Sequence, residues 1–162
     1  MKGNNSEIYI YPDEEIITEF EQTVGNLSHL LSFTKQYYLN IQHDEIDLLI
    51  NMIERAKKSI DGDCFINEQD FIKMHLLITT YDNANTSMSD QLLGAYYLRI
   101  LAADAKICLQ HLKRILKINK NISEDVLEFF SQLCVCLKVM ASYEAIQQQE
   151  QIVPLPSYTI QN

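Results

Sequence analysis

Apolar residues recur at steps of three or four along most of the chain, whereas alternation with a period of two is brief. The longer spacing places apolar side chains on one stripe of an α-helix. The 162 residues include only 4 Gly and 3 Pro, and 47% are hydrophobic. This composition is too apolar for a disordered chain and too poor in Gly and Pro for a loop-rich one. The sequence therefore predicts an all-α protein, a single-domain bundle of about five mostly antiparallel helices.

Five segments carry the helical pattern, and short connections between them favour antiparallel neighbours. The first extends from about Asp13 to Ile41 and follows Pro12, a residue favoured at helix starts. The remaining four are expected at about 44–59, from 67 to the polar loop 82–89, from that loop to 119, and from 123 to 151. The domain limits that follow are an extended or flexible segment at 1–12, a bundle at 13–151 and a Pro-containing tail at 152–162.

Polar residues at three helix starts are placed to act as caps. Asp44 can accept hydrogen bonds from free backbone N–H groups at the start of the second helix. Asn67, with Asp70 three residues later, forms a variant of the capping-box pattern at the third. Ser123, followed by two acids, is expected to start the fifth.

The apolar stripes predict which side chains face the core. In the first helix they are Ile16, Phe20, Val24, Leu27, Leu31, Thr34, Tyr38 and Ile41. In the third they are Phe71, Ile72, His75, Leu76 and Thr79. In the fourth they are Leu93, Tyr96, Tyr97, Ile100, Leu101, Ala103, Ile107, Leu112, Ile115 and Leu116. In the fifth they are Val126, Phe130, Leu133, Leu137 and Met140.

Residues 59–71 partly match the calcium-binding loop of an EF-hand, which lies between two helices. Asp61 and Asp63 fall at its third and fifth positions and Asp70 at its twelfth, but the first acid and the turn glycine are missing. These departures favour the other interpretation, a turn followed by the Asn67 cap. A ligand- or ion-responsive module that uses this loop or a pocket between helices is our second functional hypothesis.

Asp104, Cys108 and His111 share one face of the fourth predicted helix. Asp104 and His111 would be about 10 Å apart along the axis, so one zinc ion could take only the Cys and the His and would need ligands from elsewhere. The other interpretation is a small core cysteine beside a partly exposed histidine. A cryptic enzyme or metal site at Cys108 and His111 is our third hypothesis. We assign no catalytic, cofactor-binding or metal-binding residue.

Motifs for catalysis and cofactor binding are missing from the sequence. It contains no GxSxG elbow, no glycine-rich phosphate loop and no HExxH pair. We therefore expect that the protein is not an enzyme and uses no cofactor. One lysine and no apolar stretch of signal-peptide length occur near the N-terminus, and the four cysteines have no framework spacing, so we expect a cytoplasmic protein without a membrane partner.

Charge is distributed unevenly along the chain, whose net charge is −9. Residues 1–54 contain 10 acidic and 2 basic side chains, whereas residues 55–120 contain 7 acidic and 10 basic ones. The acidic group that we assign to partner binding is Glu14, Glu15, Glu19 and Glu21. A basic stripe on the fourth helix, which includes Lys106, Lys113 and Lys117, either contacts an acidic or phosphate-bearing partner or is a solvated helix face that opposes the acidic first helix. The overall charge argues against nucleic acid.

Tyrosine supplies most of the aromatic side chains, with 9 Tyr, 6 Phe and no Trp. Tyr37-Tyr38 and Tyr96-Tyr97 are adjacent pairs on predicted helices, so one member of each pair is expected nearer the surface. Exposed tyrosines are common anchors in protein–protein contacts. Our leading hypothesis is therefore a small acidic interaction module, such as an inhibitor, immunity-type protein, adaptor or chaperone, that binds a partner protein with a basic surface. A homodimer is the alternative occupant of such a surface.

Overall fold

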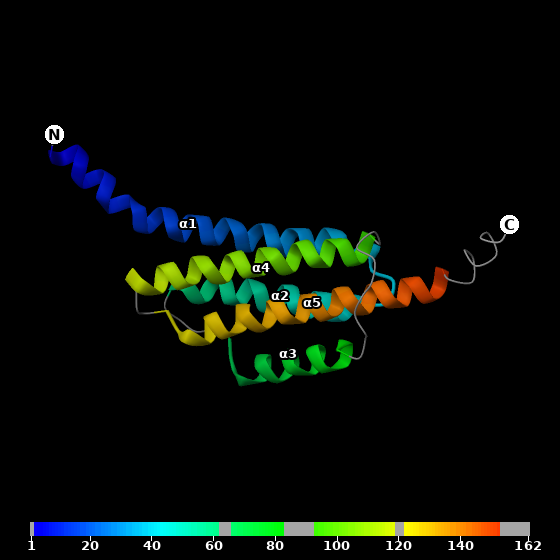
Figure 1. The fold of residues 1–162 in the computed structure, drawn as a ribbon. Helices are drawn as coiled ribbons and strands as arrows, with labels where there is room; N and C mark the ends of the chain where they lie inside the picture. The colour runs from blue at the N-terminus through cyan, green and yellow to red at the C-terminus, as the bar shows by residue number, and fades with distance from the viewer. Residues whose placement is uncertain (1, 62–65, 83–92, 119–121, 153–162) are drawn as a thin grey trace.

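The computed structural model describes residues 2–61, 66–82, 93–118 and 122–152 (Figure 1). These ranges contain helices and no strand, so the predicted all-α class is confirmed. The long helices are α1 (Lys2–Thr34), α2 (His43–Lys58), α3 (Glu68–Tyr81), α4 (Leu93–Ile118) and α5 (Glu124–Ile152). Two short 3₁₀ helices follow α1 and α2, namely η1 (Lys35–Tyr37) and η2 (Ser59–Asp61).

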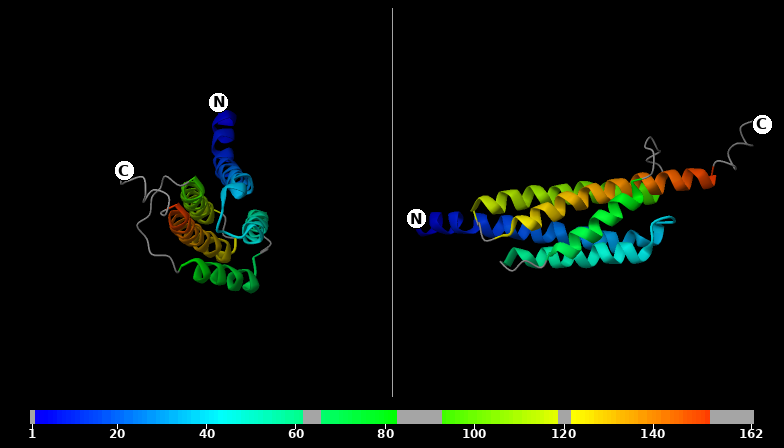
Figure 2. Two further views of the ribbon diagram at one scale, coloured as in Figure 1. Left: turned by 90° about the vertical axis from the view of Figure 1, so that its right-hand side faces the viewer. Right: turned by 90° about the horizontal axis from the view of Figure 1, so that it is seen from below.

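The five long helices enclose one core, to which α3 contributes Met74, Leu77 and Tyr81 (Figure 2). α4 packs against both α5 and α1, α2 packs against α1, and α3 packs against α5. Each long helix is antiparallel to the one before it in the chain, as predicted (Figure 1). Consequently α1 and α4 lie side by side in opposite directions, and together they form one long face of the bundle.

The centre of the bundle is filled by aromatic and branched side chains. Phe20 of α1 and Phe129 of α5 both contact Phe130 edge to face, with ring centroids 5.7 and 5.2 Å from it. All three rings are fully buried. The fully buried members of the predicted stripes of the first and fifth helices are Phe20, Val24, Leu27, Leu31, Thr34, Val126, Phe130, Leu133, Leu137 and Met140.

Two of the three predicted helix caps are confirmed. Asn67 and Asp70 form a reciprocal capping box, and the Asp125 N–H donates to Ser123 Oγ at 3.1 Å. The prediction for Asp44 is wrong, because Gln42 occupies the cap position of α2 and makes no side-chain cap bond. Asp44 lies in the first turn instead, where the helix dipole stabilises a negative charge.

Helix α1 begins at Lys2, whereas the sequence predicted a start at Asp13 and an extended or flexible segment over 1–12. Its first part projects beyond the rest of the bundle (Figures 1 and 2). Pro12 therefore lies within a helix rather than at its start. The loop 83–89 and the tail 153–162 lie outside the described residues.

The predicted inner face of the third helix is wrong. α3 buries Asp70, Met74, Leu77 and Tyr81, and it leaves the side chains of Ile72 and Leu76 46% and 58% exposed. Two apolar stripes compete on this helix, so periodicity alone selected the wrong one. The buried stripe includes Asp70 because an arginine neutralises that carboxylate, as described below.

The outer side of α4 is also more apolar than predicted. Leu93, Tyr96, Ala103 and Ile107 were expected in the core but are exposed. The helix buries Ala95, Leu98, Ala102, Ala105 and Cys108 in addition to Leu101, Leu112 and Ile115. α4 packs against α1 on one side and α5 on the other. Small side chains of α4 fill these close contacts, and several of its larger apolar side chains face solvent.

Among the described residues, the segment Glu124–Ala145 of α5 is long and apolar enough to cross a membrane by length and composition. Core helices of soluble proteins pass the same test, and half of this segment's most apolar window is buried in the bundle. The segment is therefore weak evidence for a membrane span.

Candidate partner-binding surface

The connection between α1 and α2 is held by a buried carboxylate of α5. Glu144 is 0% exposed, and it accepts hydrogen bonds from the backbone N–H groups of Leu39 at 2.8 Å and Asn40 at 3.0 Å. Burial raises the pKa of the Glu144 carboxyl, while the backbone N–H donors oppose that shift. These bonds satisfy backbone groups in a segment without regular structure and fix it against α5.

Gly94 allows the start of α4 to lie directly against this anchor. A Cβ atom at position 94 would be 3.0 Å from the Tyr37 carbonyl oxygen and 3.1 Å from Glu144 Oε2. The first contact is with backbone, which cannot move aside as a flexible side chain can. Glycine therefore suits this close approach, which brings the first turn of α4 beside η1.

Hydrogen bonds of two tyrosine hydroxyls also stabilise the same end of the bundle. The Thr34 hydroxyl donates to the Leu30 carbonyl at 2.8 Å and lies 2.6 Å from the Tyr38 hydroxyl. Tyr81 of α3 bonds Glu45 of α2 and packs edge to face on Tyr143 of α5, with ring centroids 4.9 Å apart. Burial raises the pKa of both Tyr38 and Tyr81. This end of the bundle is thus held by buried and partly buried polar contacts, which join α5 to the α1–α2 connection and α3 to α2.

A row of aromatic rings lies on the outside of this fixed end. Phe33 of α1 and Tyr37 of η1 have ring centroids 6.2 Å apart, Tyr37 and Tyr97 are 5.5 Å apart, and Tyr97 and Tyr96 are 6.1 Å apart. Phe33 is 52% exposed and Tyr96 is 49% exposed. Leu93, one turn before Tyr96, is also exposed. We call Phe33, Tyr37, Leu93, Tyr96 and Tyr97 the aromatic patch.

The expectation for the tyrosine pairs holds at both sites. Tyr38 is buried whereas Tyr37 is half-buried, and Tyr97 is half-buried whereas Tyr96 is exposed. Sequence reasoning missed Phe33 and the anchor Glu144. The sequence does contain a signal for each residue. Phe33 lies off the apolar stripe of α1, which predicts an exposed ring, and Glu144 continues the apolar stripe of α5, which predicts a buried carboxylate.

Three of the four predicted acidic residues lie together. Glu14, Glu15 and Glu19 are exposed and line one shallow hollow on α1, far from the aromatic patch along the helix. Glu21 is half-buried and lines a separate hollow beside Lys57 of α2. Glu19 also faces α4, where its carboxylate is 3.9 Å from the Arg114 guanidinium. The acidic first helix thus opposes a basic residue of the fourth, as the second interpretation of the basic stripe expected.

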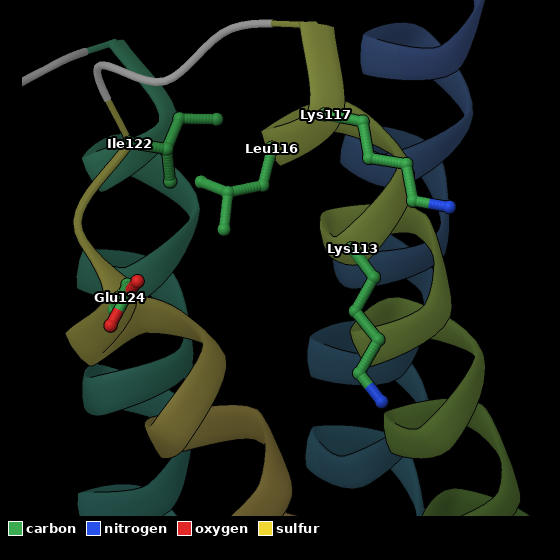
Figure 3. Close-up of a pocket in the computed structure, with 5 residues that line it drawn as sticks. All are labelled: Lys113, Leu116, Lys117, Ile122 and Glu124. Carbon is green, nitrogen blue, oxygen red and sulfur yellow. The ribbon is translucent and has the colours of Figure 1, made fainter.

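The predicted lysines are all exposed but do not form one site. Lys113 and Lys117 border a hollow at the end of α4, together with Leu116, Ile122 and Glu124. Figure 3 shows Leu116 and Ile122 pointing toward one another, whereas both ammonium groups lie on the other side of Leu116. Lys106 belongs to a different hollow, between α4 and α5.

The acid at the twelfth position of the EF-hand-like segment has another role. The Arg55 guanidinium donates to both oxygens of Asp70, at 2.7 and 2.6 Å, and the Asn67 N–H donates to Oδ2 at 2.8 Å. These contacts with Arg55 lower the pKa of Asp70. A carboxylate engaged in this way would have to leave Arg55 before it could coordinate calcium. Residues 62–65 of the same segment lie outside the described chain.

The geometry around Cys108 does not assemble a metal site. Cys108 is fully buried, and burial raises the pKa of its thiol to about 12. Within the described residues, no group of three or more His, Cys, Asp or Glu side chains is placed to hold a metal ion.

Comparison with known proteins adds no functional assignment. No protein-family model matches the chain, and no curated protein matches it in sequence.

Proposed function

We propose that the protein acts by binding another protein on its α1–α4 face, with the aromatic patch as the anchor. The observation that carries this proposal is the row of four rings, of which Phe33 and Tyr96 are each about half exposed on a fixed backbone. Large aromatic side chains that are already held in place lose little conformational entropy on binding. Such residues are the usual centres of binding energy in protein interfaces.

Electrostatics indicate the kind of partner. Phe33 and Glu19 lie on one face of α1 and are separated by roughly 21 Å at 1.5 Å per residue, and Glu14 lies about 8 Å further along the helix. A standard interface of about 800 Å² per partner is roughly 30 Å across, so one partner can cover both regions. The expected partner therefore has an apolar pocket for the aromatic patch and basic residues that face Glu14, Glu15 and Glu19. The acidic cluster would increase the association rate, and the rings would slow dissociation.

Site-specific photo-crosslinking tests this proposal. A photoreactive phenylalanine analogue replaces Phe33 or Tyr96 in two variants, and it replaces Leu76 of α3 in a control of similar exposure. The proposal expects one protein to be crosslinked from positions 33 and 96 and not from position 76. Equal crosslinking from position 76, or none from any position, would contradict it. A product of twice the chain mass of 18.8 kDa would identify a second copy as the occupant and would exclude a different partner.

A further inference from the structure

We propose that a hollow between α4 and α5 binds a small phosphate-bearing anion. The hollow measures about 440 Å³ and lies on the outer side of the two helices. Three cationic side chains line it, Arg99 and Lys106 from α4 and Lys138 from α5. This inference goes beyond the protein-binding proposal and does not depend on it, because none of these residues belongs to the aromatic patch.

The hollow exists because small side chains form its floor. Ala102 and Ala103 lie between Arg99 and Lys106, so on one face of α4 two cations flank two short side chains. The long cationic side chains can therefore reach over a recessed surface. A volume of this size is within the usual range of sites for small ligands.

The charge of the hollow favours an anion. None of the described residues that line it is acidic, although the chain has 22 acidic and 13 basic residues. Within the described chain, Lys106 and Lys138 form no ion pair. Asp104 is close in sequence, but at 100° per residue it lies roughly 200° around α4 from Ala102 and from Lys106. Among the described residues that line the hollow, Lys106 and Lys138 thus have no carboxylate beside them.

Two further polar groups suit a phosphate ligand. Ser142 of α5 lines the hollow and offers a hydroxyl donor. Cys134, two turns before it, is 9% exposed, and its thiol donates to the Ala102 carbonyl at 3.4 Å. Lysine ammonium groups and a hydroxyl are donors that commonly hold phosphate oxygens. The position of Cys134 also supplies a reporter, because a ligand in the hollow would cover its sulfur.

The test measures the rate at which iodoacetamide alkylates Cys134 with and without millimolar inorganic pyrophosphate. Sodium chloride at matched ionic strength is the salt control. A Cys64→Ser background removes the cysteine that lies outside the described residues, and Cys108 and Cys136 are fully buried. The test variant is Lys106→Gln with Lys138→Gln. The control is Lys113→Gln, which removes a positive charge from the same helix outside the hollow.

Pyrophosphate is expected to slow alkylation in the parent and in the Lys113→Gln control. The double variant should need on the order of tenfold more pyrophosphate for the same protection, because charge-assisted hydrogen bonds are lost. Equal melting temperatures without pyrophosphate would show that all variants are folded. Protection that is missing in the parent, or unchanged in the double variant, would overturn the proposal.

The source of the phosphate can be resolved with the same variants. Phosphatidylcholine vesicles with and without phosphatidic acid are tested for binding in parallel with pyrophosphate. Binding only to vesicles with phosphatidic acid, lost in the double variant, would assign the hollow to a lipid headgroup. Protection by pyrophosphate without vesicle binding would assign it to a soluble phosphate compound.

Discussion

The two ends of the bundle each bury a carboxylate, and the two carboxylates are stabilised in different ways. At the aromatic end, Glu144 accepts backbone N–H bonds from the α1–α2 connection, and burial raises its pKa. At the opposite end, Asp70 is held by both guanidinium N–H₂ groups of Arg55, which lower its pKa. The first arrangement fixes an irregular segment, and the second fixes the start of a regular helix.

This difference shows why the anchor of the binding surface is expected at one end only. The Glu144 anchor holds the backbone that carries Tyr37, and Gly94 lets the first turn of α4 approach it. Exposed rings are thereby fixed in place without being buried. On the α1–α4 face of the other end, the exposed Glu19–Arg114 pair is solvated and adds little stability.

The largest loss of stability is expected when the Glu144 anchor at the aromatic end is removed. Glu144→Ala leaves the N–H groups of Leu39 and Asn40 without their acceptor and opens a cavity at a fully buried position, so the free energy of unfolding should fall by about 4 kcal/mol. Urea denaturation measures this change. The control Glu128→Ala removes an exposed carboxylate from the same helix and should alter stability by less than about 0.5 kcal/mol. A loss below about 1 kcal/mol for Glu144→Ala would refute the anchoring role.

A smaller loss is expected at the opposite end. Asp70→Ala removes the contacts with Arg55 and half of the capping box, which should cost about 2–3 kcal/mol. Arg55 is 28% exposed and can be solvated again, which keeps the cost below that of a fully buried pair. Asp47→Ala breaks the exposed Lys35–Asp47 pair and serves as the matched control, with an expected loss under about 0.5 kcal/mol. Equal losses in the two variants would count against this account.

The pH dependence should have opposite signs at the two ends. The folded pKa of Glu144 is above its ordinary 4.5, so its stabilising effect is present below that pH and is lost as pH rises through the folded pKa. The folded pKa of Asp70 is below 3.8, so its effect is present above that pH and is lost as pH falls through the folded pKa. Relative to Glu144→Gln, the parent should lose stability as pH rises. Relative to the Asp70→Asn variant, the parent should gain stability as pH rises. Differences that change in the same direction would contradict these assignments.

The smallest effect is expected for the ion pair on the α1–α4 face. Glu19→Ala removes an exposed contact with Arg114 at 3.9 Å, so the free energy of unfolding should change by less than about 0.5 kcal/mol. Thermal denaturation at low and high salt measures this change. A loss above about 1 kcal/mol would mean that the charged end is fixed as firmly as the aromatic end.

Local sequence rules predicted the helices and most of their caps. Asn67 with Asp70 and Ser123 could be recognised because a cap depends on residues within one turn. The inner line of α5 could be recognised because its apolar residues form one stripe. The start of α1 at Lys2 was missed because Pro12 was read as the helix start.

Local sequence rules could not predict the features that depend on contacts between distant parts of the chain. α3 has two apolar stripes, and only the position of Arg55 on another helix explains why Asp70 faces inward. The exposed side of α4 depends on close packing with both α1 and α5. The aromatic patch combines Tyr37 and Tyr97, which are 60 positions apart in the sequence and meet where Gly94 lets α4 approach closely.

The central claim is that the aromatic patch is the anchor of a protein interface. The most direct measurement is the affinity of the crosslinked partner for two double variants, Phe33→Ser with Tyr96→Ser and Ile72→Ser with Leu76→Ser. All four side chains are about half exposed, so neither pair should unfold the bundle. The patch variant should bind at least about 30-fold more weakly, since central interface residues each contribute about 2 kcal/mol or more, and the α3 variant should bind like the parent. Equal affinity of the two variants would contradict the claim.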